Sequence, residues 1–241
     1  MRNREQAPAS RRTRSAKPPV SRRGRPAKPP LSRETIVAAG LRVLDAEGLD
    51  ALTMRRVARE LDTGAASLYV YVDNRDDLLA AMVDSELATV VYPTEGGWRE
   101  RIAALVESQV TALTRHPGLA MAALGTIPSS PNASLVGEHL LNALLESGID
   151  ERTAAWAVDL IGLWISATAA EHTINEMRGE SGLGESDYLE RINEYYAGLD
   201  PANYPTVLAL RELLLSGTGD ERAAWGLSVI LNGIISTPVP Q

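Results

Sequence analysis

The sequence predicts an all-α protein with a three-helix N-terminal domain followed by a larger helical domain. From Ser32 onward, apolar residues recur at intervals of three and four, which is the period of an amphipathic helix. No stretch alternates apolar and polar residues between hairpin turns, and no repeat of fixed period is evident. Gly, Pro, Asn and Asp residues divide the chain into the expected helices 33–47, 53–61, 65–72, 74–87, 98–116, 118–125, 132–147, 150–178, 186–198, 205–216 and 220–236.

These helices group into three expected segments. Residues 1–31 are rich in Arg, Pro, Ser and Ala and have almost no bulky apolar residues, so this arm cannot bury enough surface to fold alone. Residues 32–92 form the small helical domain, and residues 93–241 form the larger one. Pro93 and a following pair of glycines mark the boundary between them.

Composition narrows the class of protein. The chain has no cysteine, which excludes disulfides and thiolate metal sites and suits a reducing cytoplasm. It has no long run of uncharged apolar residues, and no apolar region follows the basic start, so we expect neither a membrane span nor a secretory signal. Residues 1–33 hold eleven basic residues and one acid, although the whole chain has a net charge of −7. Such an arm suits phosphate neutralisation, and a merely solvated tail is the alternative.

Capping residues set the boundaries of the first helices. Ser32 can cap the first helix, which ends near Gly48, and Thr53 begins the second. Asn74 with Asp77 three residues later predicts a start of capping-box type for the fourth helix. Each helix presents one apolar side, made of Ile36, Val43 and Leu44; Met54, Val57, Ala58 and Leu61; Leu68 and Val72; and Leu78, Leu79, Met82 and Leu87.

Residues 52–72 have the spacing of a helix-turn-helix. Two short helices join through a tight turn at Gly64, and each supplies apolar residues to a shared core. With Leu68 and Val72 facing inward, the exposed residues of the second helix are Ala65, Ala66, Ser67, Tyr69, Val70 and Tyr71. Exposed tyrosines and a valine suit the phosphates, sugars and thymine methyls of a DNA major groove better than water. An ordinary helical hairpin is the alternative.

Residues 32–90 resemble the DNA-binding domain of the TetR family of transcriptional regulators. The matching motifs are Thr53-x-Arg55-Arg56-Val57-Ala58, Leu68-Tyr69-x-x-Val72 and Asn74-Arg75-Asp76-Asp77-Leu78. The chain departs from the family at Asp62, where a glycine usually follows the second helix, and this predicts a less easily formed turn. The resemblance implies DNA contacts at Arg55, Gly64, Ala65, Ala66, Ser67, Tyr69, Val70, Tyr71 and Arg75.

Different roles are expected among these contacts. An arginine can bond guanine O6 and N7 together, so Arg55 is the candidate for reading a base. Tyr69 and Arg75 are expected to hold phosphates. The recognition helix has no Lys or Arg of its own, so its direct readout should be sparse.

The arm offers a second DNA-binding candidate. Its segment Arg22-Arg23-Gly24-Arg25-Pro26 resembles an AT-hook core, in which arginines enter a narrow A·T minor groove. Arg23 and Arg25 are therefore candidate DNA contacts. The motif is short, so a chance match is the alternative.

Residues 98–236 resemble, more faintly, the C-terminal domain of the tetracycline-repressor branch of the family. The resemblance rests on Leu124-Gly125-Thr126-x-Pro128, Gly162 with Glu171, Trp225-Gly226-Leu227 and Asn232-Gly233. It implies an inducer cavity and a dimer formed by helices 150–178 and 220–236. Small residues would allow close approach of these helices, so the candidate interface is Gly162, Gly226, Leu227 and Gly233. Burial inside one subunit is the alternative.

Polar or aromatic residues within apolar stretches are candidates for the inducer site: Met121, Thr126, His139, Asn142, Trp164 and Thr168. In the tetracycline repressor, as the resemblance implies, a metal-bound His lies three residues before the position of Thr126. Ala123 occupies that place here, so we expect an apolar inducer with no metal and no cofactor.

The resulting expectation is a cytoplasmic, homodimeric repressor that binds a palindromic double-stranded DNA operator, has no membrane partner and is released by a hydrophobic small molecule. An efflux or biosynthesis gene is the expected target. An activator, or a regulator without a ligand, is the alternative of the same fold. An enzyme is not expected, because the chain has three histidines, no cysteine and no nucleophile or metal signature.

Overall fold

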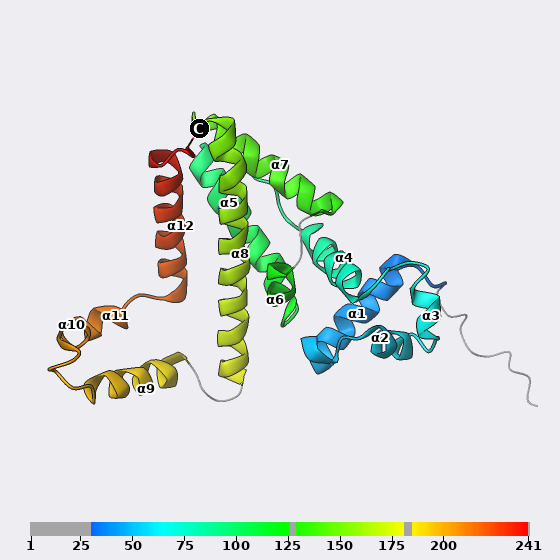
Figure 1. The fold of residues 1–241 in the computed structure, drawn as a ribbon, viewed down its shortest axis with the longest axis horizontal. Coiled ribbons are helices and arrows are strands. Elements are labelled where there is room, and N and C mark those ends of the chain that lie inside the picture. The colour runs from blue at the N-terminus through cyan, green and yellow to red at the C-terminus, as the bar shows by residue number, and fades with distance from the viewer. Residues whose placement is uncertain (1–29, 126–128, 181–184, 241) are drawn as a thin grey trace, which may run out of the picture. The chain divides into compact units, whose positions relative to one another are not determined.

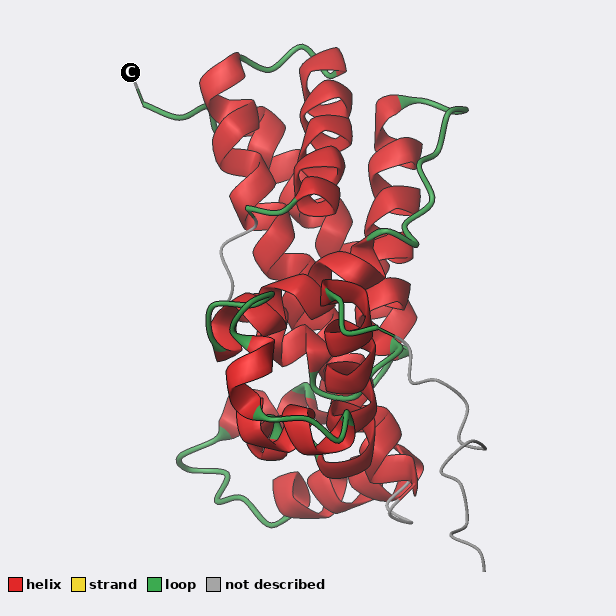
Figure 2. Cartoon of the chain, turned by 90° about the vertical axis from the view of Figure 1, so that its right-hand side faces the viewer, coloured by secondary structure: helices red, strands yellow, loops and turns green. Residues whose placement is uncertain are grey.

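The computed structural model describes residues 30–125, 129–180 and 185–240. Arg23 and Arg25 of the arm and Thr126 of the proposed inducer site lie outside the described residues. Residues 31–241 form one compact unit. Within the described residues this unit is helical and contains no strand, which confirms the predicted fold class (Figure 2).

Helices follow one another along the unit in the order expected from the sequence (Figure 1). Their bounds are α1 Arg33–Glu47, η1 Leu49–Ala51, α2 Met54–Glu60, α3 Ala65–Leu68, α4 Arg75–Leu87, α5 Trp98–Thr114, α6 Leu119–Leu124, α7 Pro131–Glu146, α8 Glu151–Glu180, α9 Glu185–Ala197, α10 Pro205–Ala209, α11 Arg211–Leu214 and α12 Gly219–Ser236.

The predicted caps are present at the start of the chain's helices. Ser32 forms a capping box with Thr35 at α1, and the Thr53 side chain accepts from the backbone N–H of Arg56 at α2. The Asn74 side chain accepts from the N–H of Asp77 at α4. The Asp77 carboxylate does not return this bond, because it accepts instead from the Asp73 N–H and from an arginine on α1. Local hydrogen bonding therefore explains where these helices begin.

Two predicted helices differ from those observed. The recognition helix, expected over 65–72, ends as a regular helix at Leu68, although the N–H groups of Tyr71 and Val72 still bond the Leu68 carbonyl. The helix expected over 205–216 is divided into α10 and α11 at Leu210, whose ψ of 9° departs from helical geometry. The short helix η1 was not predicted at all.

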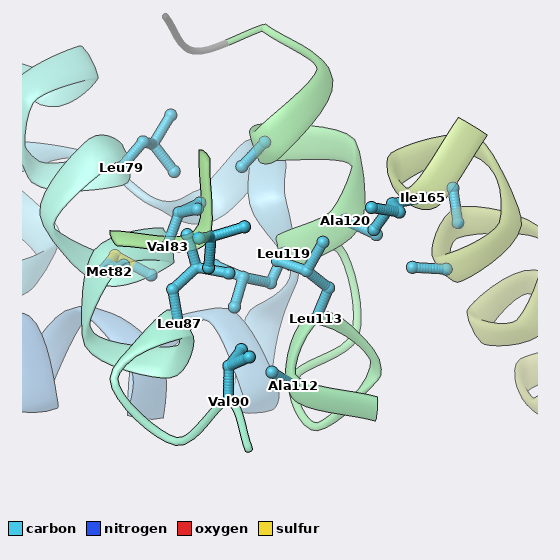
Figure 3. Close-up of a cluster of buried hydrophobic side chains, with 14 of the residues drawn as sticks. Leu79, Met82, Val83, Leu87, Val90, Ala112, Leu113, Leu119, Ala120 and Ile165 are labelled. Carbon is cyan, nitrogen blue, oxygen red and sulfur yellow. The ribbon is translucent and has the colours of Figure 1, made fainter. Parts of the chain in front are cut away.

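Helix α4 lies at the centre of the apolar core. Its residues Met82, Val83 and Leu87 face Leu119 of α6 and Leu113 of α5 (Figure 3). On its other side, α1 approaches so closely that a Cβ added at Gly40 would lie 2.8 Å from the Met82 sulfur. The same helix therefore packs against both the N-terminal helices and the later ones.

The central helix of the later part is α8, which contacts α5, α6 and α7. Residues Glu151–Met177 of this helix are long and apolar enough to cross a membrane by length and composition alone. Its inner residues, such as Ile161, Ile165 and Ala169, are buried in the protein core, which accounts for that apolar character.

Candidate DNA-binding surface and ligand cavity

The turn between α2 and α3 has the geometry of a helix-turn-helix. The N–H of Thr63 bonds the Ala58 carbonyl at 2.9 Å, and Asp62 has a φ of 50°, the only positive φ at a non-glycine residue in the described part. A left-handed conformation favours glycine because a Cβ is crowded there. This explains physically why the aspartate at this place was expected to make the turn harder to form.

The second helix of the motif presents the expected residues to the outside. Leu68 and Val72 are buried, as predicted, whereas Tyr69, Val70 and Tyr71 are 52, 78 and 38% exposed. The small residues Gly64 and Ala66 are also exposed, and Ala65 and Ser67 are partly so. An apolar and aromatic face is thus open to solvent, and its contact with DNA stays a prediction.

Most arginines of the first four helices are held by acids of the same domain. Arg56 bridges Glu47 and Glu60, and its hydrogen bonds hold the pKa of both carboxyls below the usual range. Arg42 also reaches Glu60, with Nε 3.4 Å from the carboxylate. Arg33 donates to both the Asp77 carboxylate and a backbone carbonyl. These cations stabilise the domain and are partly neutralised.

Two arginines differ from the others. Arg55 and Arg59 on α2 are exposed and have no ion pair or hydrogen bond within the described residues. Both line a shallow hollow beside the turn, together with Thr63 and the start of α3. Sequence reasoning selected Arg55 but missed Arg59, because nothing in the sequence shows which arginines lack an acidic partner.

The structure assigns Arg75 a role that the resemblance did not imply. Its Nε donates to the Leu52 carbonyl at 2.8 Å and its Nη2 to the Leu49 carbonyl at 2.9 Å. The side chain is half-buried and ties the start of α4 to the connection before α2. A free phosphate-holding side chain at this position is therefore a wrong expectation, since two of its donors are already used inside the domain.

A cavity of about 600 Å³ lies between α4, α5, α6, α7 and α8. Small and aliphatic residues make most of its wall, including Ala80, Val83 and Leu87 of α4. Ala123, the residue at the expected metal-binding position, also lines it. A cavity of this size and apolar lining suits a drug-sized organic molecule.

None of the described inducer-site candidates lines this cavity. Met121 is exposed, Thr168 is buried in the core, and Trp164 packs against Gly226. His139 stacks on Tyr92 with ring centroids 4.2 Å apart. It shares a more open groove with Asn142, whose amide donates to the Glu138 carboxylate. The sequence criterion failed because the cavity wall is small and aliphatic, a composition with no marker in the sequence.

An aspartate on α4 fastens the start of α7. The Asp84 carboxylate accepts from the backbone N–H of Asn132 at 2.9 Å and from the N–H of Ala133 at 3.3 Å. The Asn132 amide donates in return to the Asp84 carbonyl and carboxylate. Helix N-termini carry unsatisfied N–H groups, and this carboxylate satisfies two of them. The two helices that line opposite walls of the cavity are thereby connected.

The predicted dimer residues have unlike surroundings. Gly226 and the buried Leu227 pack inside the subunit, because a Cβ at Gly226 would lie 2.5 Å from Cη2 of Trp164. Gly162 lines the cavity, and Gly233 alone is exposed without a close neighbour. At Gly226 and Leu227 the alternative of burial inside one subunit is therefore the correct one.

Exposed apolar side chains nevertheless remain on the outer faces of the same two helices. Trp156, Leu160 and Leu163 on α8 are about half exposed, and Trp225 and Val229 on α12 are more than 45% exposed. Large apolar residues at spacings of three and four on exposed faces indicate contact with a further surface.

A helix-turn-helix joined by one helix to a cavity-bearing helical part defines a ligand-sensing type of DNA-binding regulator. Two sequence families match the chain: "Bacterial regulatory proteins, tetR family" over residues 36–82, and "Tetracyclin repressor-like, C-terminal domain" over residues 92–237. The chain belongs to the TetR family of bacterial transcriptional regulators. Members of this family are regulators and not enzymes.

Individual relatives agree with this assignment. The HTH-type transcriptional repressor DrrR1 of Streptomyces coeruleorubidus is 30% identical over 83% of this chain and 76% of its own. The class G tetracycline repressor protein of Vibrio anguillarum is 29% identical over 59% of this chain and 69% of its own. The TetR family protein ActR of Streptomyces coelicolor, solved in complex with actinorhodin, is 34% identical, with a TM-score of 0.76 over 87% of this chain and 97% of its own.

Proposed function

We propose that this protein is a cytoplasmic homodimeric repressor that binds a palindromic operator and leaves it when a hydrophobic small molecule enters the cavity. Residues 32–92 read the DNA, and residues 93–241 bind the ligand and dimerise. The regulated gene is one for efflux or biosynthesis of such a molecule. The names of two relatives support the proposal, since DrrR1 is called a repressor and ActR was solved with actinorhodin.

The observation that carries the proposal is the position of α4. At its start, Arg75 and Asp77 bind it to the connection before α2 and to Arg33 of α1. Farther along, the same helix forms one wall of the cavity and is fastened to α7 through Asp84. A ligand that displaces α4 or α7 therefore changes the placement of the helix-turn-helix, which is how two distant sites become coupled.

The dimer part of the proposal rests on the exposed apolar faces of α8 and α12. A second copy of the chain would cover Trp156 and Leu160 of α8 and Trp225 of α12. A dimer also presents two recognition helices, which binding to two half-sites of a palindrome requires.

The DNA-reading part gives the two unpaired arginines separate roles. Arg55 reads a base, whereas Arg59, at the edge of the same hollow, holds a phosphate. Tyr69 bonds a phosphate through its hydroxyl. Replacing a base-reading residue changes sequence preference, while replacing a phosphate contact weakens all sequences alike.

Gel retardation of neighbouring promoter fragments, followed by titration of variants, tests the proposal. Arg55→Ala should cost about 1–3 kcal/mol and relax the preference at one base pair per half-site. Arg59→Ala should weaken all operators alike and reduce the slope of log K against log salt by about 0.9 per lost contact on each half-site. Arg42→Ala is the matched control, because Arg42 is already paired with Glu60, and it should leave binding nearly unchanged.

Two results would contradict the proposal. A protein that sediments as a monomer and still binds a palindrome with full affinity would remove the dimer. A complex that no hydrophobic compound dissociates, while the compounds do bind the protein, would remove the ligand-released repressor.

A further inference from the structure

The cavity has one charged residue in its wall. That residue is Asp159 on α8, and the other lining residues are aliphatic, glycine, serine or the amide Gln109. Asp159 is exposed, which places it at the mouth of the cavity, and it forms no ion pair or hydrogen bond within the described residues. No Lys, Arg or His side chain lines the cavity to neutralise it.

A second acceptor lies in the wall. Gln109 of α5 is 6% exposed, and its Nε2 donates to the Leu105 carbonyl at 3.3 Å. Its Oε1 has no partner in the described part of the chain and is open to a donor in the cavity. Buried polar atoms normally find a hydrogen-bond partner, so an amide oxygen facing an apolar cavity suits a ligand that brings a donor.

We propose that the cavity selects molecules that combine a bulky apolar body with a protonated amine. The apolar body is buried between α4, α7 and α8, and the ammonium group lies against the Asp159 carboxylate at the mouth. A neutral analogue loses this attraction, and an anion is repelled by the same carboxylate. This inference names the ligand class of the proposed regulator and therefore rests on the proposed function.

The competing explanation is that Asp159 is only a solvated acid on the outer face of α8. In that case the cavity binds apolar molecules without regard to charge. The two explanations differ in one measurable quantity, the ratio of affinities for a cationic ligand and its neutral isostere.

Fluorescence titration of the full chain with 1-pyrenemethylamine and 1-pyrenemethanol measures this ratio. The probes share one ring system, and only the amine is charged at neutral pH. The amine should bind about tenfold more tightly than the alcohol, with the advantage shrinking as salt is raised because the carboxylate is exposed. Pyrene-1-acetate, the anionic member of the series, should bind most weakly.

Three variants locate the effect. Asp159→Asn should bring the amine to the affinity of the alcohol while the alcohol changes by less than about twofold. Glu171→Gln, which removes an exposed acid on the same helix outside the cavity wall, should retain the tenfold ratio. Gly162→Leu should weaken both probes by more than tenfold, because an added side chain meets no atom there and extends into the cavity.

The outcomes separate this inference from the proposed function. If the alcohol binds as tightly as the amine, and Gly162→Leu blocks both, the cavity is a ligand site and the amine preference is wrong. The inference is also wrong if Asp159→Asn retains the preference. If no probe of any charge binds, both the ligand-binding role of the cavity and the inference fall.

Discussion

The contact between Gly226 and Trp164 determines how α12 is seated on α8, and it can be tested by adding one methyl group. In Gly226→Ala the new Cβ would lie 2.5 Å from Cη2 and 2.7 Å from Cζ2 of the indole. Carbon atoms prefer a separation of about 3.5–4.0 Å, so the helices must part by roughly 1 Å or the indole must leave its rotamer. Overpacking of this kind costs about 1–3 kcal/mol.

A gain in helix propensity opposes this cost. Replacing an interior helical glycine by alanine stabilises a helix by about 0.5–1 kcal/mol. Gly162→Ala on α8 is the matched control, because a Cβ there meets no atom within 4 Å and should produce the gain alone. The free energies of unfolding of the two variants should therefore differ by about 1–3 kcal/mol, with Gly226→Ala the less stable.

Urea unfolding followed by circular dichroism measures this difference, at one subunit concentration because dimerisation contributes to stability. In a Trp164→Leu background the clash is absent, so Gly226→Ala should become stabilising and the pair should show a coupling energy of about 1–3 kcal/mol. If Gly226→Ala stabilises the original chain as much as Gly162→Ala does, the indole does not hold α12 and the reasoning is refuted.

Two further predictions concern the connection between α4 and the first helices. Arg75→Ala should lower the free energy of unfolding by about 1–3 kcal/mol, since two backbone carbonyls lose their donor; unchanged thermal stability with weaker DNA binding would instead make Arg75 a phosphate contact. The Arg33 guanidinium holds the pKa of the Asp77 carboxyl below its usual range. A carboxyl with a lowered folded pKa stabilises the protein above its unfolded pKa, near 4, and this stability is lost as the pH falls through the folded pKa. Arg33→Ala should therefore lower stability at pH 7 by less than about 1 kcal/mol, because the pair is partly exposed, and have little effect at pH 2. Equal losses at both pH values would contradict this assignment.

The sequence by itself determined the helical class, the starts of α1, α2 and α4 and the inner and outer faces of the recognition helix. These features are local. Ser32, Thr53 and Asn74 cap the residues directly after them, and the burial of Leu68 and Val72 follows from a spacing of four residues.

Only the tertiary structure decided which arginines are free, what lines the cavity and how α12 packs. Arg75 finds its carbonyl partners in a segment more than twenty residues earlier, whereas Arg59 finds none in the described part. The cavity is a space left between five helices, and its wall depends on crossing positions that helical periodicity does not contain. A small residue such as Gly226 can face a partner subunit, a cavity or an indole ring, and its type is the same in all three cases. The choice is made by the packing of α8 against α12.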